Sequence, residues 1–471
     1  MGRDPSCRLT FDGSSGSVSR KHAMIRAEGD RFEIADQRSS NGTVVNQQRT
    51  ERAWLNAGDV IELGTGGPRL KVRIVDAAPE VASGTAAAPR PKLVDMTLYD
   101  PSRHAAPQRS MLGLVVVLGM MAVGVGMGLL VALMTMFELG LGVSIVGVFV
   151  AFAPCPVYLT LWLWLDRYDP EPAWALAGAF LWGAGASTFV SMILNTLFGV
   201  AVHSATGNAG LSQFLSASIS APFVEEAAKG LCVLVIFLVL RREFDGVLDG
   251  IVYAGVVALG FATVENVLYY GRNLQGGGAG AMLFVFFLRG VLGPFSHAVF
   301  TSMTGIGCGI ARQSHNPIVR VIAPVGGYFG AVFLHSLWNT VAGLVGLGGF
   351  FFVYVLFWVP LFFVFLGVVL WMGHRESVVI ARQLKHEVAL GLLTQQQADI
   401  ASSWPKRMGW LMSSMGDFTR LRARRKFLTM VTRLALSYWH VERAQSAGGE
   451  TLSAGLIPNF RMEVARLKAA V

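Results

Sequence analysis

Charged side chains are scarce in this sequence. Asp, Glu, Lys and Arg make up 15% of its 471 residues, whereas 53% of the residues are hydrophobic. Soluble globular domains usually carry about 25% charged residues. The shortage of charge therefore excludes an ordinary soluble fold and favours a chain that crosses a bilayer many times.

Cysteine is also scarce, and no two cysteines stand at the spacing of a metal site or a redox pair. Three of the four lie in apolar runs, so we interpret them as buried small residues and expect no disulfide framework. The four are Cys7, Cys155, Cys232 and Cys308. The motif His-Glu-x-x-His, which marks many zinc peptidases, is absent as well.

The first residues are polar and rich in Gly and Ser, and the first apolar run begins near Met111. We therefore expect no cleavable signal peptide. The net charge is +9, but Lys and Arg lie mostly at the two ends of the sequence and in short loops between apolar runs. Membrane topology requires that distribution, so we expect a lipid bilayer and no nucleic acid as a partner.

The sequence divides into four parts. Residues 1–76 alternate apolar and polar positions in short runs broken by Gly, Asn and Asp, which predicts a small all-β sandwich. Residues 77–110 are rich in Ala and Pro and are expected to form a flexible linker. Residues 111–373 are predicted to form a polytopic α-helical membrane domain, and residues 374–471 a basic, helical cytoplasmic tail.

Eight apolar stretches in the membrane domain reach the length of about 20 residues that spans a bilayer. They are 111–134, 141–165, 173–202, 213–240, 247–270, 281–311, 321–346 and 349–373. On one side the loops carry five arginines, Arg167, Arg241, Arg242, Arg312 and Arg320. The opposite loops carry only Arg272. The positive-inside rule then predicts a multi-pass protein of the cell membrane with both termini in the cytoplasm.

Ionisable residues inside the bilayer are costly, at about 2.5–3.5 kcal/mol each on insertion scales, and therefore mark candidate functional sites. Here they are concentrated in the fourth to seventh stretches. The fourth stretch carries Glu225, Glu226 and Lys229, and the fifth carries Glu265. The sixth carries Arg289 and His297, and the seventh carries His335 and the polar Asn339. Counted from the ends of the stretches, Glu225, His297 and His335 lie near the middle of the membrane. Arg289 is expected to pair with a glutamate or to reach the interface.

Two kinds of chemistry suit this set. A glutamate beside a histidine can act as a general base on water that attacks a peptide carbonyl, while Asn339 or a histidine donates to the oxyanion. Alternatively, histidines and glutamates can bind zinc. For that site the residue types suggest Glu226, Glu265, His297 and His335, with Glu225 as a base or a further ligand.

Several motifs in residues 1–76 occur together in a fixed order. They are Gly2-Arg3, Ser19-Arg20-Lys21-His22, Asp36, Ser39-Ser40-Asn41-Gly42-Thr43, Asn46 and Gly58-Asp59. This set resembles the forkhead-associated (FHA) domain, a β-sandwich that binds phosphothreonine peptides. The resemblance implies that the phosphate would be contacted by Arg3, Ser19, Arg20 and Ser40. It also implies that Asn41 would hold the peptide backbone, and that His22 would be structural.

Five further motifs fall in consecutive stretches of the membrane domain. They are Glu225-Glu226-x-x-Lys229, Asp249-Gly250-x-x-Tyr253, Gly260-Phe-Ala-x-x-Glu265-Asn266-x-x-Tyr269, Ser296-His297 and His335-x-x-Trp338-Asn339. Over about residues 150–373 they resemble the PrsW family of membrane peptidases, within the CAAX-protease and bacteriocin-processing group. The resemblance implies an enzyme that cleaves membrane proteins, such as anti-sigma factors, with Glu225, Glu226, Glu265, His297, His335 and Asn339 as its catalytic set.

The resulting hypothesis is an intramembrane peptidase, glutamate- or zinc-dependent, that is recruited or regulated through a phosphothreonine-containing partner. Two alternatives come from other functional classes. One is a non-catalytic, phospho-dependent membrane scaffold. The other is a proton-coupled transporter, because intramembrane Glu and His also form proton relays. An inverted repeat would favour the transporter, but the polar residues occupy the fourth to seventh stretches only.

Overall fold

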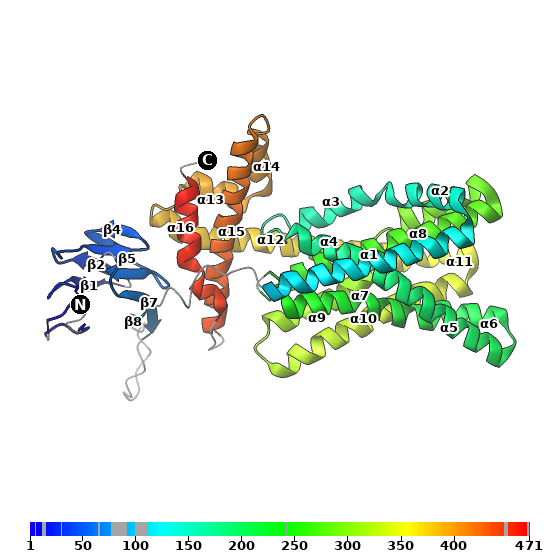
Figure 1. The fold of residues 1–471 in the computed structure, drawn as a ribbon, viewed down its shortest axis with the longest axis horizontal. Helices are drawn as coiled ribbons and strands as arrows, with labels where there is room; N and C mark the ends of the chain where they lie inside the picture. Colours follow the sequence, from blue (N-terminus) through cyan, green and yellow to red (C-terminus); the bar gives the residue numbers. More distant parts are fainter. Residues whose placement is uncertain are drawn as a thin grey trace. The chain divides into compact units, whose positions relative to one another are not determined.

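A computed structural model of the chain describes all 471 residues except 5, 12–15, 30, 65, 77–91, 99–110, 242, 447–450 and 469–470. The chain forms two compact units. The first combines Met1–Gln108 with Ser377–Val471, and the second is Arg109–Glu376. Figure 1 labels the helices and strands of both units.

The N-terminal region consists of two antiparallel sheets, as the alternating pattern predicted. Its strands are β1 (Ala23–Glu28), β2 (Arg31–Asp36), β3 (Thr43–Val45), β4 (Gln48–Thr50), β5 (Arg52–Leu55), β6 (Val60–Leu63), β7 (Arg69–Asp76) and β8 (Lys92–Leu98). One sheet has the order β1-β2-β5 and the other β4-β3-β6-β7-β8. Ile34 of the first sheet and Ile61 of the second are fully buried in one shared hydrophobic core, so the sheets form a sandwich.

Strand β8 lies within the stretch that we expected to be a linker. It pairs with β7 over its whole length, from Leu70 opposite Leu98 to Asp76 opposite Lys92. The run Lys-Leu-Val-Asp-Met-Thr-Leu contains no proline and suits a strand. The rest of the expected linker, residues 77–91 and 99–110, lies outside the described residues.

The C-terminal region is helical, as predicted. Its helices are α12 (Val359–Ala389), α13 (Gln395–Ser402), α14 (Trp404–Met412), α15 (Phe418–Ser446), η5 (Leu452–Gly455) and α16 (Ile457–Lys468). Helix α13 begins with a reciprocal cap, in which Thr394 accepts a hydrogen bond from the Gln397 backbone and the Gln397 side chain accepts one from the Thr394 backbone.

One buried ionic cluster joins the β-sandwich to these helices. Arg461 of α16 forms ion pairs with Asp59, in the turn before β6, and with Glu387 of α12, whose Oε1 lies 3.2 Å from the arginine Nε. Tyr438 of α15 donates a hydrogen bond of 2.5 Å to the same Glu387 oxygen. Asp59 and Glu387 are almost completely buried. The sandwich and the tail therefore pack as one unit.

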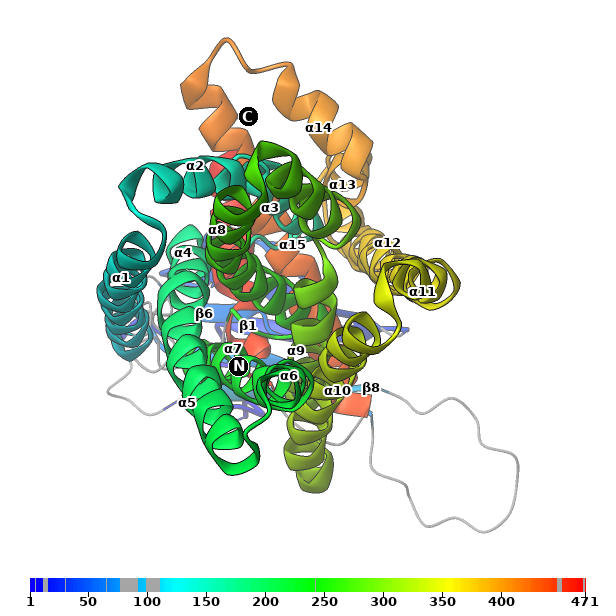
Figure 2. The same ribbon diagram turned by 90° about the vertical axis from the view of Figure 1, so that its right-hand side faces the viewer.

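The second unit is a helical bundle. Its helices are α1 (Met111–Leu139), α2 (Leu141–Phe152), α3 (Cys155–Leu165), α4 (Ala173–Leu181), η1 (Trp182–Ser187), α5 (Thr188–Thr206), α6 (Ala209–Leu215), η2 (Ser216–Ser220), α7 (Ala221–Val239), α8 (Val247–Phe286), η3 (Phe287–Leu292), α9 (Ser296–Gln313), α10 (Pro317–Leu344), α11 (Gly346–Val353) and η4 (Tyr354–Trp358), which continues into α12. Figure 2 looks along the bundle, with α7, α8 and α9 in its interior and α1, α5 and α10 towards the outside.

Small residues bring the interior helices together. Gly250 of α8 and Gly305 of α9 lie backbone against backbone, and a Cβ on either glycine would overlap the backbone of the other. Such close approach is typical of helix packing in membranes, where small residues let backbones make contact. Every residue of α8 from Gly250 to Phe261 is buried. This packing fixes the positions of α8 and α9, which carry part of the polar cluster.

Among the described residues, six helical stretches are long and apolar enough to cross a membrane, so the predicted count of eight is not confirmed. They are Met111–Leu139, Leu141–Leu165, Ala173–Thr206, Val247–Gln313, Pro317–Leu344 and Gly348–Ala389. Val247–Gln313 is one stretch of 67 residues that contains both 247–270 and 281–311. The expected stretch 213–240 is helical but is not among the six, because Glu225, Glu226 and Lys229 all lie in the 19 residues of α7.

Candidate active site in the helical bundle

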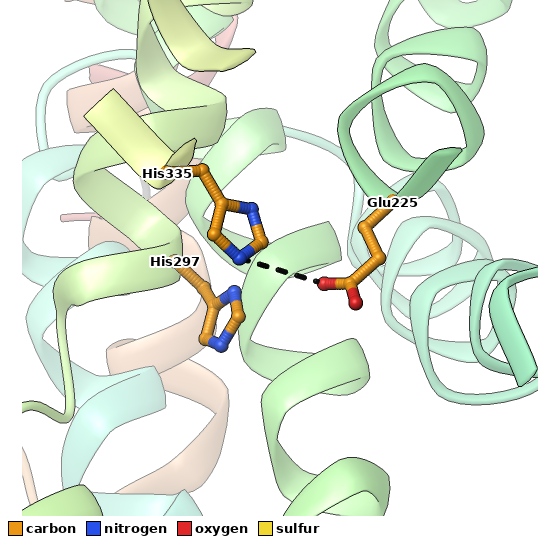
Figure 3. A group of neighbouring side chains, drawn as sticks. All are labelled: Glu225, His297 and His335. Atoms are coloured by element: carbon orange, nitrogen blue, oxygen red, sulfur yellow. Dashed lines mark ion pairs between the residues drawn. The ribbon is translucent and has the colours of Figure 1, made fainter. Parts of the chain in front are cut away.

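Three ligand-type side chains from three helices meet inside the bundle. Glu225 comes from α7, His297 from the first turn of α9 and His335 from α10. One donor atom from each residue lies within 4.8 Å of the other two, and all three residues are buried. Figure 3 shows both imidazole rings and the carboxylate converging on one space. The sequence predicted these three residues at similar depth.

The two histidines and Glu225 leave room for a bound group between them. His335 Nε2 lies 3.8 Å from Glu225 Oε2, and the two imidazole centroids are 5.1 Å apart at nearly a right angle. Glu225 Oε2 is buried and has no hydrogen-bond partner among the residues that the structure describes. A buried carboxylate oxygen without a partner is costly. It therefore marks a position where a cation or a water is expected to bind.

Glu226 lies behind His335 and not on this space. Its Oε1 is 2.9 Å from His335 Nδ1 and accepts a hydrogen bond of 2.5 Å from Lys229 Nζ. Its Oε2 accepts a hydrogen bond of 2.8 Å from Thr301 on α9. Glu226 and Lys229 are completely buried, so the ammonium offsets the carboxylate charge inside the bundle. Glu226 thus orients the ring of His335.

Glu265 of α8 contacts His297 at Nε2, while the Nδ1 of that ring lies 3.4 Å from Lys229 Nζ. The Oε2 of Glu265 lies 3.2 Å from His297 Nε2, and it forms an ion pair with Arg289 of η3. Arg289 also donates to the Asn266 side chain at 2.6 Å and lies over the ring of Tyr269, 3.8 Å from its centroid. The expectation that Arg289 pairs with a glutamate is therefore confirmed.

The donor set fits a divalent metal such as zinc. Two histidines and one glutamate form a known catalytic zinc set that keeps one position open. Histidines that bind metals usually place their other ring nitrogen on a carboxylate, which fixes the ring. Here His335 is held by Glu226 and His297 by Glu265. The group that converges is Glu225 with both histidines. The residue types had predicted Glu226 and Glu265 as ligands beside the histidines, with Glu225 as a base or a further ligand.

These residues line a cavity of about 640 Å³. Glu225, Glu265, His297, His335 and Asn339 all contribute to its wall, and Glu226 does not. The cavity is large enough for a short extended segment of polypeptide. The three converging donors are therefore accessible from an internal space and are not sealed in the core.

The amide of Asn339 is already engaged. Its Nδ2 donates a hydrogen bond of 2.8 Å to the carbonyl of Ala217 in η2, so it links α10 to η2 and is not aimed at an oxyanion. Asn195 of α5 also belongs to this group but was not among the predicted site residues. Its Nδ2 lies 3.5 Å from Glu225 Oε1, and its Oδ1 accepts a hydrogen bond from Ser220. An Asn in an otherwise apolar stretch was the available signal.

The residues that the FHA resemblance singled out lie together at one end of the β-sandwich. Arg3 donates from its backbone to the carbonyl of Ser19 at 3.1 Å, and the Ser40 backbone donates to Ser19 Oγ at 2.9 Å. Asn41 Nδ2 donates to the Ser17 carbonyl at 3.0 Å. Arg20 is highly exposed and pairs with Asp4 at 3.2 Å. These side chains come from three separate loops.

His22 lies beneath those loops. Its Nδ1 accepts a hydrogen bond of 2.9 Å from the Ser19 backbone, and its Nε2 lies 3.1 Å from the carbonyl of Gly42. With Nδ1 as the acceptor, Nε2 carries the proton and donates to that carbonyl. The ring is completely buried, and burial lowers the pKa of His22. A neutral His22 therefore ties two of the loops together.

Comparison with known proteins identifies two regions. Residues 171–365 match the profile of the PrsW family intramembrane metalloprotease, and residues 1–64 match the FHA domain. Protease PrsW of Clostridioides difficile (strain 630) is 38% identical over 113 residues, which are 23% of this chain and 45% of that protein. Protease PrsW of Bacillus subtilis (strain 168) is 31% identical over 150 residues, 32% of this chain and 61% of that protein.

The N-terminal region has relatives of its own. The glycogen accumulation regulator GarA of Mycolicibacterium smegmatis is 40% identical over 63 residues, which are 13% of this chain and 39% of that protein. No solved structure matches the chain. The chain thus spans about half the length of the curated relatives it matches. Residues 171–365 of this chain form a domain of the PrsW family, and residues 1–64 form an FHA domain.

Proposed function

We propose that this chain is an intramembrane endopeptidase of the PrsW type, which hydrolyses a peptide bond of a membrane protein. The observation that carries the proposal is the convergence of Glu225, His297 and His335 within 4.8 Å inside a helical bundle that contains six stretches long and apolar enough to cross a membrane, counted over the described residues. Buried ionisable groups in such helices are costly and are kept for function. The PrsW-family match over the same helices supports the reaction class.

We propose that Glu225, His297 and His335 hold a divalent metal, with zinc as the first candidate. When bound there, the cation would act as a Lewis acid on the carbonyl of the scissile bond and on the attacking water. Glu226 and Glu265 keep the two imidazoles in orientation, and Lys229 and Arg289 offset their charges. Without a bound cation, Glu225 Oε2 is the atom placed to take a proton from the attacking water.

Glu226 and Glu265 are therefore assigned as positioning residues of the proposed site. Asn339, which the family resemblance implied as part of the catalytic set, is assigned to the cavity wall because its amide donates a hydrogen bond to the carbonyl of Ala217. The proposed catalytic set is thus reduced to Glu225, His297 and His335, with the two flanking carboxylates in support.

We propose further that the FHA domain recruits or regulates the peptidase through a phosphothreonine-containing protein. A phosphate offers three strong acceptor oxygens, and Arg3, Ser19, Arg20 and Ser40 supply guanidinium and hydroxyl donors at one end of the sandwich. Asn41 would hold the backbone of the phosphopeptide. A membrane protein of anti-sigma type, with one membrane span, is the class of substrate that we expect.

The proposed arrangement in the membrane has eight spans with both termini in the cytoplasm. With this orientation the FHA domain lies in the cytoplasm, where kinases and their phosphorylated products are found. A phosphorylation signal could therefore reach the peptidase through the FHA domain. Two features favour eight over six. The 67-residue stretch is long enough for two spans, and α6, η2 and α7 together run over 209–239. Cysteine accessibility from each side of sealed vesicles would test the orientation.

The experiment for the peptidase compares protein termini in membranes that contain the wild-type chain or Glu225→Gln. We expect the wild type to generate new termini within or beside single-span proteins, and Glu225→Gln to generate none while it remains folded. Glu138→Gln is the matched control, because Glu138 on α1 is half-exposed and pairs with Arg272 away from the cavity. Termini that persist in Glu225→Gln would refute the assignment.

A further inference from the structure

A second, apolar cavity of about 280 Å³ adjoins the catalytic cavity. We call it the aromatic pocket. Its wall includes Val299, Phe300, Trp338, Tyr354, Trp358 and Phe362. Gly293, Pro294, Ser296 and Trp338 line both cavities. The two spaces therefore lie on either side of the short turn that precedes His297.

The ring of Phe300 lies between the aromatic pocket and His335 of the proposed metal site. Phe300 stacks on the imidazole of His335, with centroids 5.1 Å apart and the planes inclined by 24°. The other neighbours of Phe300 include Trp358, at 5.8 Å, and Trp338, at 6.3 Å, both in the pocket wall. Neighbouring residues of an extended peptide are about 3.3 Å apart along the chain. A substrate side chain in the pocket would thus belong to a residue close to the scissile peptide bond, which would lie next to His335.

The pocket wall offers little to a polar side chain. Tyr354 Oη already donates to the Leu292 carbonyl at 2.8 Å, and Ser296 Oγ donates to the Gly293 carbonyl at 2.8 Å. Trp358 Nε1 is a buried donor without a partner among the described residues, and the rest of the wall is almost entirely aromatic or aliphatic. A polar group buried there without a partner would lose its hydration with no compensating bond. The pocket therefore favours a large apolar side chain, and aromatic walls add edge-to-face contacts.

The pocket can be reached from the outside of the bundle. Two of its wall residues, Val291 and Phe363, are exposed on the bundle surface, at 53% and 63%. An apolar surface of a bundle in a bilayer faces lipid, which is also where a membrane-spanning substrate lies. The size, about 280 Å³, is below the usual range of roughly 300–1,000 Å³ for whole ligands and suits part of one.

We propose that the aromatic pocket binds one large apolar side chain of the substrate and fixes where the chain is cut. The occupant is a Leu, Ile, Met, Phe, Tyr or Trp within two residues of the scissile bond. This inference rests on the proposed peptidase function and adds the sequence preference of the cut. The argument for a substrate side chain is the shared wall of the two cavities and the contact of Phe300 with His335.

The test profiles the residues around each cut that depends on Glu225 in membranes containing the full chain. We expect one fixed position, within two residues of the cut, to carry a large apolar side chain in most cuts. Val299→Phe fills the pocket, and Val299 does not line the catalytic cavity. We expect this variant to reduce cuts with large residues at that position by about tenfold relative to cuts with Ala or Gly.

Two further variants secure the test. Phe362→Ala enlarges the pocket and is expected to shift the preference towards the largest residues, Trp and Tyr, so the proposal does not depend on the folding of Val299→Phe. Val321→Phe, at a 66% exposed position of α10, is the matched control and should leave the profile unchanged.

The outcomes separate the two proposals. Cuts that depend on Glu225 but show no fixed apolar position, or that keep their profile in both pocket variants, overturn the pocket proposal and leave the peptidase standing. An equal loss of all cuts in both pocket variants also overturns it. The pocket would then bind a lipid acyl chain or contribute to folding, and it would not select the cut site. The absence of any Glu225-dependent cut overturns the peptidase and the pocket proposal with it.

Discussion

The Nδ1 atom of His335 lies 2.9 Å from the carboxylate of Glu226, which is completely buried. The opposite nitrogen of the ring faces Glu225 at 3.8 Å. Two adjacent glutamates of one helix therefore lie on two sides of a single imidazole. One faces the cavity and the other supports the ring, and this division of roles leads to the first prediction.

Glu226→Gln is expected to weaken metal binding by about 10–100-fold, the usual effect of removing a carboxylate that orients a metal-binding histidine. The same change leaves the buried Lys229 without a charged partner, and breaking such a pair costs about 3–5 kcal/mol of stability. Both effects can be measured on purified protein, by metal titration and by thermal unfolding.

A double variant separates these two effects. Glu226→Gln with Lys229→Met removes the unpaired charge, so much of the lost stability should return while metal affinity stays low. Thr301→Val is a milder control that removes one hydrogen bond to Glu226. If metal affinity returns together with stability in the double variant, Glu226 acts only through the fold.

Arg461→Ala is expected to loosen the contact between the β-sandwich and the C-terminal helices. It would leave Asp59 and Glu387 as buried, unpaired carboxylates, at a cost of about 3–5 kcal/mol. Amide hydrogen exchange should then speed up in the turn before β6 and in α16. Arg466→Ala is the matched control on the same helix, since Arg466 is exposed. Equal exchange rates in the two variants would show that the ionic cluster does not stabilise the contact between the β-sandwich and the C-terminal helices.

The stability of the FHA domain is expected to fall as the pH drops below about 6.5. Burial lowers the pKa of His22 in the folded domain, whereas an unfolded His titrates near 6.5. Below that pH the unfolded chain binds the proton more readily, so acidification favours unfolding. The protection of the amides of residues 1–64 in the full chain, which is the exchange rate relative to the intrinsic rate at the same pH, should therefore fall between pH 7.5 and pH 5.5. In His22→Gln this part of the pH dependence should disappear.

A phosphothreonine peptide is expected to bind the full chain, and Ser40→Ala should weaken that binding by about tenfold or more. A hydrogen bond to a charged phosphate contributes about 1.5–3 kcal/mol, and Ser40 lies beside Ser19 at the proposed site. Isothermal titration with phosphorylated and unphosphorylated peptides measures the effect. Arg52→Ala, on an exposed position of β5, is the control. Equal affinity for both peptides would contradict the proposed phosphate site.

The sequence indicated which polar residues of the bundle belong to the proposed site, but not where each of them lies. Charged and imidazole side chains are costly in a bilayer, so Glu225, His297 and His335 were conspicuous without any structure. Glu225 and Glu226 are neighbours on a helix and differ by about 100° in direction. Which of them faces the cavity depends on how α7 packs against α9 and α10, and that packing is not encoded in local spacing.

Other differences have similar physical causes. Asn339 was assigned to the chemistry from its place one turn after His335, but its amide bonds to a carbonyl of η2 that no sequence pattern indicated. The strand β8 was hidden because the surrounding stretch is dominated by Ala and Pro. The buried pair of Asp59 and Arg461 joins residues 402 positions apart, which lies beyond any local signal.

The metal content of the purified chain tests the central claim most directly. The account predicts about one zinc or similar divalent ion per chain in the wild type, and loss of that ion in Glu225→Ala and in His335→Ala, with the metal retained in the Glu138→Ala control. A wild-type chain that cleaves its substrate after complete removal of metal by a strong chelator would contradict the metal centre. It would leave Glu225 as a general base acting on water.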